Sequence, residues 1–269
     1  MAENTIKGEK KGNIFYLTIN RPEKRNAISF DMIEEMSVMV EDCIIDPDIR
    51  VIILKGAGKV FSAGVDLNSL GSLVERFGSD AAAGGAPIRA DIAKYQQFVN
   101  RLETIEIPII CAMHNRALGL GLEIALASDI RLMSEDCLWG MLELKFGVIA
   151  DLGGTSRLGR VVGSARAMEI LMTRRMYTAQ QALEWGLVNY VYPEQDLFVE
   201  AEKMAEEIAA TAPIPVGATK RIIKKGESVD LMTQLDMEVN LQSIILRSED
   251  FKEGIQAMIE NRKPNWQRQ

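Results

Sequence analysis

The sequence is poor in the residues on which many enzyme classes depend. It has one histidine, His114, and three widely spaced cysteines, Cys43, Cys111 and Cys137. An odd number of cysteines without a CxxC pair argues against a disulfide framework and against a zinc site. A Ser-His-Asp or Cys-His mechanism would depend on His114 alone, and no GxSxG motif accompanies it. We therefore interpret His114 as structural and predict no metal centre.

Long apolar runs and an excess of positive charge are also absent. No run approaches the ~18 residues needed to span a bilayer, and the first residues lack the pattern of a signal peptide. The sequence thus predicts a cytoplasmic protein with no membrane partner. Its net charge of −7 argues against nucleic acid as a partner. There is no GxxxxGK[ST] loop, and residues 119–121 (GLG) lack the third glycine of a dinucleotide-binding loop.

Short apolar segments alternate with segments of helical spacing over the first two thirds of the chain. Helices are predicted from Ser29, where Met32, Ile33 and Met36 follow at helical intervals, and over residues 91–105 and 122–127. Thr178 and Gln181 are spaced as a capping box that opens a further short helix. Strands are predicted over residues 14–19, 51–55, 108–113, 130–133 and 188–192. The alternation indicates an α/β fold with parallel strands.

Two regions depart from this alternation. Residues 68–90 are rich in glycine and alanine, and we expect a mobile loop there with a short helix. The C-terminal third is predicted to be helical over residues 197–211, 215–225, 229–247 and 249–261. We therefore divide the chain into a core with the active site, residues 1–196, and a helical subdomain, residues 197–269. Surplus apolar residues in the latter favour self-association.

Four segments, taken in order, resemble the crotonase (enoyl-CoA hydratase/isomerase) superfamily. They are residues 20–28 (NRPEKRNAI), 56–67 (GAGKVFSAGVDL), 115–129 (NRALGLGLEIALASD) and 143–158 (ELKFGVIADLGGTSRL). The resemblance implies a spiral of ββα turns followed by a C-terminal helical trimerisation subdomain. It also implies a homotrimer or a hexamer (dimer of trimers). The implied substrate is an acyl-CoA thioester, with coenzyme A as part of the substrate and no permanently bound cofactor.

The resemblance implies that two backbone N–H groups, those of Ala63 and Leu120, form an oxyanion hole for the thioester enolate. One such donor typically contributes about 3–4 kcal/mol to a transition state. Gly64, Gly119 and Gly121 would let the backbone approach the ligand closely.

Acidic residues supply the remaining chemistry implied by the resemblance. Glu123 and Glu143 each lie among apolar residues and match the paired glutamates of hydratases, one to activate water and one to manage the proton at the α-carbon. Asp151 matches an aspartate that dienoyl-CoA isomerases use, although those enzymes usually carry aspartate at the position of Glu123. Asp151 could instead cap the helix that starts near Gly153.

Contacts with the substrate's coenzyme A moiety are also expected from the resemblance, although an exposed lysine or arginine is often only a solvated charge. The expected residues are Lys24, Arg25, Ala27, Val65, Asp66, Leu67 and, for a phosphate, Lys263.

The hypothesis is hydration of a trans-2-enoyl-CoA to a 3-hydroxyacyl-CoA. The alternative is isomerisation of an enoyl- or dienoyl-CoA with the same oxyanion hole. A non-catalytic member that binds RNA is a third class, which the two glutamates and the acidic chain argue against.

Overall fold

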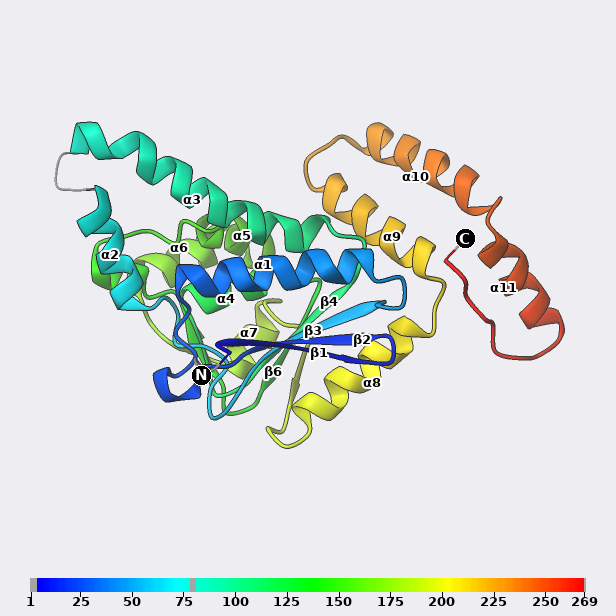
Figure 1. The fold of residues 1–269 in the computed structure, drawn as a ribbon, viewed down its shortest axis with the longest axis horizontal. Coiled ribbons are helices and arrows are strands. Elements are labelled where there is room, and N and C mark those ends of the chain that lie inside the picture. Colours follow the sequence, from blue (N-terminus) through cyan, green and yellow to red (C-terminus); the bar gives the residue numbers. More distant parts are fainter. Residues whose placement is uncertain (1–3, 78–80, 269) are drawn as a thin grey trace.

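A computed structural model of the chain describes residues 4–77 and 81–268. Its largest sheet has six strands in the order β1-β2-β3-β4-β6-β9 (Figure 1). β1 pairs antiparallel with β2, and the other neighbouring strands pair in parallel. The strands are β1 (Ile6–Lys11), β2 (Ile14–Ile19), β3 (Val51–Gly56), β4 (Ile109–Met113), β6 (Ile130–Ser134) and β9 (Tyr190–Tyr192).

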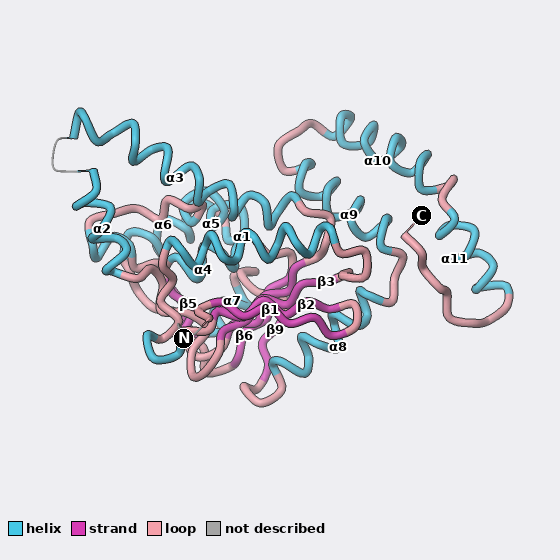
Figure 2. Tube along the Cα trace, viewed as in Figure 1, coloured by secondary structure: helices cyan, strands magenta, loops and turns pink. Residues whose placement is uncertain are grey.

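Helices cover both faces of this sheet (Figure 2). α1 (Phe30–Ile45) and α3 (Ala81–Thr104) lie over one face, and α8 (Leu197–Ala209) lies under the other. Strand β3 shows why, since successive side chains of a strand point to opposite faces. Its Ile52 and Leu54 belong to the apolar core shared with α1 and α3, whereas Val51 and Ile53 pack with α8.

A smaller sheet lies beside the large one. After β3, β4 and β6 the chain passes from the large sheet to this smaller sheet or to a β-bridge beside it. The smaller sheet contains β5 (Arg116–Leu118), β7 (Leu138–Gly140) and β8 (Tyr177–Thr178), in the order β5-β7-β8. Parallel bridges join Ser62 to Ala117 and Ile28 to Val65 beside it. β3, β4 and β6 are each followed by a smaller-sheet strand or bridge and then by a helix, so the chain forms the ββα spiral that the family resemblance implied. The fold class is mixed α/β with a C-terminal helical region.

The remaining elements connect these layers or extend beyond them. Two short 3-10 helices are η1 (Pro22–Lys24) and η2 (Glu143–Phe146). The other helices are α2 (Leu67–Phe77), α4 (Leu120–Leu126), α5 (Gly154–Val162), α6 (Ser164–Thr173), α7 (Ala179–Glu184), α9 (Pro213–Gly226), α10 (Leu231–Ile245) and α11 (Glu249–Ile259). None of the helices within the described ranges has the length and hydropathy required to cross a bilayer.

The prediction of a mobile loop over residues 68–90 was wrong for most of that segment. α2 runs to Phe77 and α3 begins at Ala81, while residues 78–80 lie outside the described part of the chain. Leu67, Leu70, Val74 and Phe77 stand at helical spacing. Alanine is the strongest helix former, and each glycine costs only about 1 kcal/mol, so a helix tolerates these glycines.

The predicted boundary at residue 196 does not separate the packing units. Leu197, Ala201 and Ala205 of α8 are fully buried against the large sheet, so α8 belongs to the core. The helices that stand away from the sheet are α10 and α11, at the orange and red end of Figure 1.

Candidate active site

Two backbone segments that are distant in sequence lie side by side at the smaller sheet. The N–H of Ser62 donates to the carbonyl of Arg116 at 3.0 Å, and the N–H of Leu118 donates to the carbonyl of Ser62 at 3.1 Å. Gly64 and Gly119 have φ values of +99° and +49°, in the region that favours glycine. A Cβ atom at Gly121 would lie 2.5 Å from the Cβ of Ser62. The close approach of the two segments therefore depends on these glycines.

The donors of the expected oxyanion hole differ in part from the prediction. The N–H of Ala63 donates to the carbonyl of Arg25 at 2.9 Å, so it is already bonded. In contrast, the N–H groups of Val65 and Leu120 have no hydrogen-bond partner among the described residues, and both residues line one cavity. The bridge between Ile28 and Val65 explains this, because it uses the carbonyl of Gly64 and the N–H of Asp66 and leaves the N–H of Val65 unbonded. The available pair is thus Val65 and Leu120 rather than Ala63 and Leu120.

The cavity has a volume of about 280 Å³ and brings together the three predicted carboxyl groups, Glu123, Glu143 and Asp151. These residues come from α4, η2 and the loop before α5. The rest of its wall is apolar or aromatic and consists of Phe30, Val65, Leu70, Ile88, Ile92, Tyr95, Leu120, Val148, Ile149 and Leu152. Apolar walls of this kind strengthen electrostatic effects on a reacting group.

Glu123 is the most deeply buried of the three carboxyls, at 2% exposure. Its Oε2 accepts a hydrogen bond of 2.8 Å from the N–H of Gly154, the first residue of α5. Burial raises the pKa of Glu123 to about 8, and the neighbouring carboxyls of Glu143 and Asp151 add to the rise against the effect of that hydrogen bond. Glu123 therefore holds a proton at neutral pH.

Glu143 and Asp151 are less deeply buried and less constrained by contacts. Burial raises the pKa of both carboxyls, and Asp151 adds to the rise at Glu143. The Oε2 atom of Glu143 is buried without a hydrogen-bond partner in the described part of the chain. A Cβ atom on Gly119 would lie 2.7 Å from its Oε1, so Glu143 abuts the oxyanion backbone. Asp151 does not cap α5, whose N-cap is Gly153 with no side-chain hydrogen bond.

The residues expected to contact coenzyme A divide into two groups. Lys24 and Arg25 are exposed, and Ala27 is half-buried; all three lie in the segment whose Arg25 carbonyl accepts from Ala63. Leu67 is exposed at the start of α2. Asp66, by contrast, is buried in an ion pair with Arg21 and accepts from the N–H of Asn68 at 2.9 Å. Its carboxylate therefore holds the local structure.

Lys263 does not lie near the site of its own chain. The tail after α11 packs against the start of β3, where Arg50 donates to the carbonyl of Trp266 at 3.0 Å. The oxyanion segment follows the other end of β3, and a strand of that length spans roughly 20 Å. The contact of Lys263 with a phosphate stays a prediction.

His114 and the cysteines lie outside the carboxyl cavity. His114 is buried, with its Nε2 atom 3.0 Å from the carbonyl of Gly58 and its ring edge-on to Phe198. These contacts fit the structural role that the sequence predicted. Cys43, Cys111 and Cys137 are buried free thiols. Within residues 4–77 and 81–268, no cluster of three His, Cys, Asp or Glu side chains is arranged to hold a metal ion.

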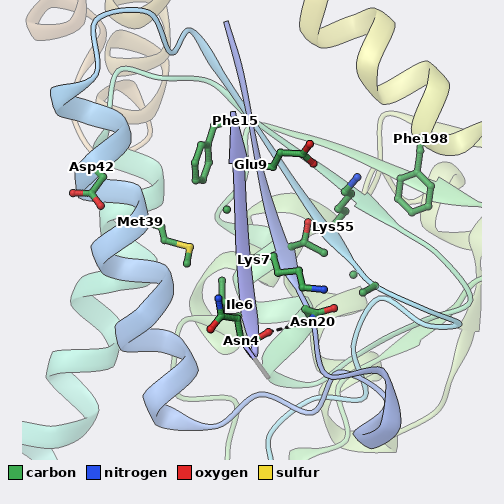
Figure 3. A pocket seen from close by; sticks show the side chains of 14 residues that line it. Asn4, Ile6, Lys7, Glu9, Phe15, Asn20, Met39, Asp42, Lys55 and Phe198 are labelled. Atoms are coloured by element: carbon green, nitrogen blue, oxygen red, sulfur yellow. Dashed lines mark hydrogen bonds between the residues drawn. The ribbon is translucent and has the colours of Figure 1, made fainter. Parts of the chain in front are cut away.

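A second cavity, of about 750 Å³, lies beside β1 and β2 between α1 and α8 (Figure 3). Lys7, Glu9 and Lys55 line it together with Phe15 and Phe198. It contains none of the three carboxyls and neither of the free N–H donors. Although it is larger, it lacks the groups that the expected reaction needs.

Comparisons with known proteins point in the same direction as this geometry. Residues 9–269 match the family model described as enoyl-CoA hydratase/isomerase. The chain is 34% identical to a peroxisomal Δ(3,5)-Δ(2,4)-dienoyl-CoA isomerase of Arabidopsis thaliana over 97% of this chain and 95% of that protein. It is also 34% identical to a short-chain-enoyl-CoA hydratase of Clostridium acetobutylicum, over 98% of this chain and 97% of that protein. The crystal structure of an enoyl-CoA hydratase from Bacillus anthracis superposes with a TM-score of 0.90 at 32% identity, over 99% of this chain and 100% of that one.

Proposed function

Since the chain belongs to the enoyl-CoA hydratase/isomerase family, within the crotonase superfamily that its sequence motifs resemble, we propose that it adds water to a trans-2-enoyl-CoA to give a 3-hydroxyacyl-CoA. The observation that carries this proposal is the pair of carboxyls, Glu123 and Glu143, that share one apolar cavity with two unbonded backbone N–H groups. The relatives include hydratases and isomerases at equal identity, so the choice between the two reactions rests on the site.

In the proposed reaction, the thioester oxygen lies against the N–H groups of Val65 and Leu120. Negative charge develops on that oxygen as the oxygen of water bonds to the β-carbon, and the two rigid donors stabilise it. One carboxylate takes a proton from the water, and a protonated carboxyl gives a proton to the α-carbon. Glu123 and Glu143 can fill both roles because two carboxyls that share a site push their pKa values apart, so that one is protonated while the other is ionised.

A specific observation supports isomerisation as the second candidate. Asp151 lines the same cavity, and its carboxyl makes no hydrogen bond or ion pair with the side chain of another residue in the described part of the chain. Asp151 and Glu143 could then exchange protons at opposite ends of a dienoyl-CoA. We favour hydration because residue 123 is glutamate, the residue type that the hydratases carry there.

The substrate's coenzyme A and the assembly are proposed on separate grounds. Lys24 and Arg25 are exposed cations beside the oxyanion segment and are proposed to contact the phosphates.

α10 buries none of its residues and exposes Leu231, Met232, Val239 and Ile244. Exposed apolar residues gathered on one helix are typical of a surface that another protein covers, which supports a homotrimer or a dimer of trimers. A cytoplasmic location remains a prediction.

The test is to measure two single variants on crotonyl-CoA and on a 3,5-dienoyl-CoA, with products followed by mass, since only hydration changes the mass. For a hydratase, Glu123→Gln should nearly abolish water addition, and Asp151→Asn should cost only about tenfold, less than the roughly hundredfold or greater effect of a general acid or base. An Asp151→Asn variant that is inactive on the diene, beside an active Glu123→Gln variant, would reverse the choice. A wild-type protein that turns over neither of the two substrates would refute both hydration and isomerisation.

A further inference from the structure

One face of α3 holds the loop that carries Asp151. Gln96, Asn100 and Glu103 follow each other at intervals of four and three residues, so their side chains form one stripe along the helix. The Nε2 of Gln96 donates to the backbone carbonyl of Asp151 at 2.6 Å. Asn100 and Glu103 accept from the guanidinium of Arg157 at 2.5 Å and 2.7 Å.

Arg157 completes the connection from α3 to this loop. It is 8% exposed and donates from Nη1 to the carbonyl of Leu152 at 3.1 Å. It packs directly over Gly153, where a Cβ atom would lie 1.7 Å from Nη1. Two successive carbonyls, those of Asp151 and Leu152, are thus held by side chains that α3 positions.

The segment held in this way contributes two groups to the cavity. One is the Asp151 carboxyl, which is bonded to no other side chain in the described part of the chain, so its direction depends on the backbone of the loop. The other is the N–H of Gly154, which donates to Glu123. A small change in this loop would therefore move the Asp151 carboxyl, whereas Glu123 is carried by its own helix, α4.

The neighbouring stripe of α3 lines the cavity. Ile88, Ile92 and Tyr95 are spaced by four and three residues and form part of the apolar wall that an acyl group would contact. Gln96 follows Tyr95 directly, so one rigid helix both contacts the acyl group and holds the loop.

We infer that Gln96 is a positioning residue, which fixes the backbone of Asp151 and so aims its carboxyl at a substrate seated against α3. This inference rests on the proposed function, because it requires Asp151 to face an acyl-CoA. Gln96 itself does not line the cavity. Its effect passes through the Asp151 carbonyl, so removing its donor should affect turnover more than binding.

The first experiment measures hydrogen exchange in Gln96→Met, which keeps the length of the side chain but removes the donor. Gln97→Met is the matched control, since Gln97 is the next residue of α3 and lies on a different face, beside Glu34 and Arg101. Loss of the Gln96 contact should speed exchange of the amides of residues 154–157 roughly tenfold, the effect of one hydrogen bond. The control should leave them unchanged. Equal exchange in both variants would overturn the inference, whatever the activity.

The second experiment is a double-mutant cycle on the acyl-CoA that depends most on Asp151. Gln96→Met should lower kcat about tenfold with KM nearly unchanged. The double variant Gln96→Met/Asp151→Asn should be no slower than Asp151→Asn alone, because both changes act on one carboxyl. Additive losses would overturn the inference and indicate a general structural role. The failure of the proposed function can be told apart from the failure of this inference. A Glu143→Gln enzyme that stays active would refute the proposed function, and it would leave the hydrogen-exchange result for Gln96→Met unchanged.

Discussion

Replacing Glu123 with glutamine should remove a penalty that the folded protein carries at alkaline pH. Glutamine has nearly the same shape, and its side-chain oxygen can accept the hydrogen bond from the N–H of Gly154 that Glu123 accepts now. What the substitution removes is an ionisable group at a site with 2% exposure.

The direction of the pH dependence of stability follows from the raised pKa of Glu123. Folding keeps Glu123 protonated up to a pH of about 8, whereas the unfolded chain releases the proton near the ordinary value of 4.5. Below pH 4.5 both states are neutral and there is no penalty. As the pH rises from 4.5 to about 8, the unfolded state is progressively favoured, so the wild-type protein loses stability through that window.

The size of this loss of stability follows from the pKa of Glu123 in the folded state and in the unfolded state. A pKa of about 8 against 4.5, at about 1.36 kcal/mol for each pKa unit, corresponds to about 5 kcal/mol above pH 8. This is an upper bound, because the carboxyl borders a cavity that can admit water. Even half of it would change the melting temperature by about 5–10 °C in a chain of this size.

The assay is thermal unfolding of the wild type and Glu123→Gln between pH 5 and pH 9. The melting temperature of the variant should rise relative to that of the wild type as the pH rises, and most of this change should occur between pH 5 and pH 8. Glu184→Gln serves as control because Glu184 is exposed on α7, and its difference from the wild type should stay constant. A constant difference for Glu123→Gln as well would show that Glu123 ionises normally and would refute the reasoning.

Three further predictions concern the site and the assembly. Glu143→Gln should lower kcat at least about a hundredfold, the scale of a general acid–base group, and near-wild-type turnover would remove Glu143 from the mechanism. Gly119→Ala places a Cβ atom 2.7 Å from Glu143 Oε1 at a φ of +49°; kcat should fall about a hundredfold or more, as when an oxyanion donor is lost, and an unchanged kcat would contradict the assigned backbone. Light scattering should give the mass of a trimer or hexamer at micromolar concentration, and a monomer would argue against self-association through α10.

The sequence by itself determined the family, the α/β alternation and the identity of the acidic residues. These features depend on local signals. Apolar runs such as residues 51–55 form strands, Ser29 and Thr178 cap helices through their own side chains, and Glu123 stands out because it is charged within an apolar helix. Each signal lies within a few residues of the feature that it predicts.

Some elements escaped sequence reasoning because their stability comes from distant partners. β1 is mostly exposed and contains Gly8 among charged residues, and it forms a strand because it pairs with β2. The place of α8 was likewise decided by the apolar face of the large sheet rather than by its helical pattern.

Only the tertiary structure decided which backbone N–H groups are free and which acids meet. Ala63 and Val65 are alike from the sequence, but a carbonyl of Arg25, 38 positions away by residue number, binds the first N–H, and the bridge to Ile28 leaves the second unbonded. Asp151 could have capped a helix or entered the cavity, and the contacts of Gln96 and Arg157 place it in the cavity. The physical reason is that hydrogen-bond partners and burial depend on segments far apart in the chain, whereas sequence patterns report mainly on neighbours.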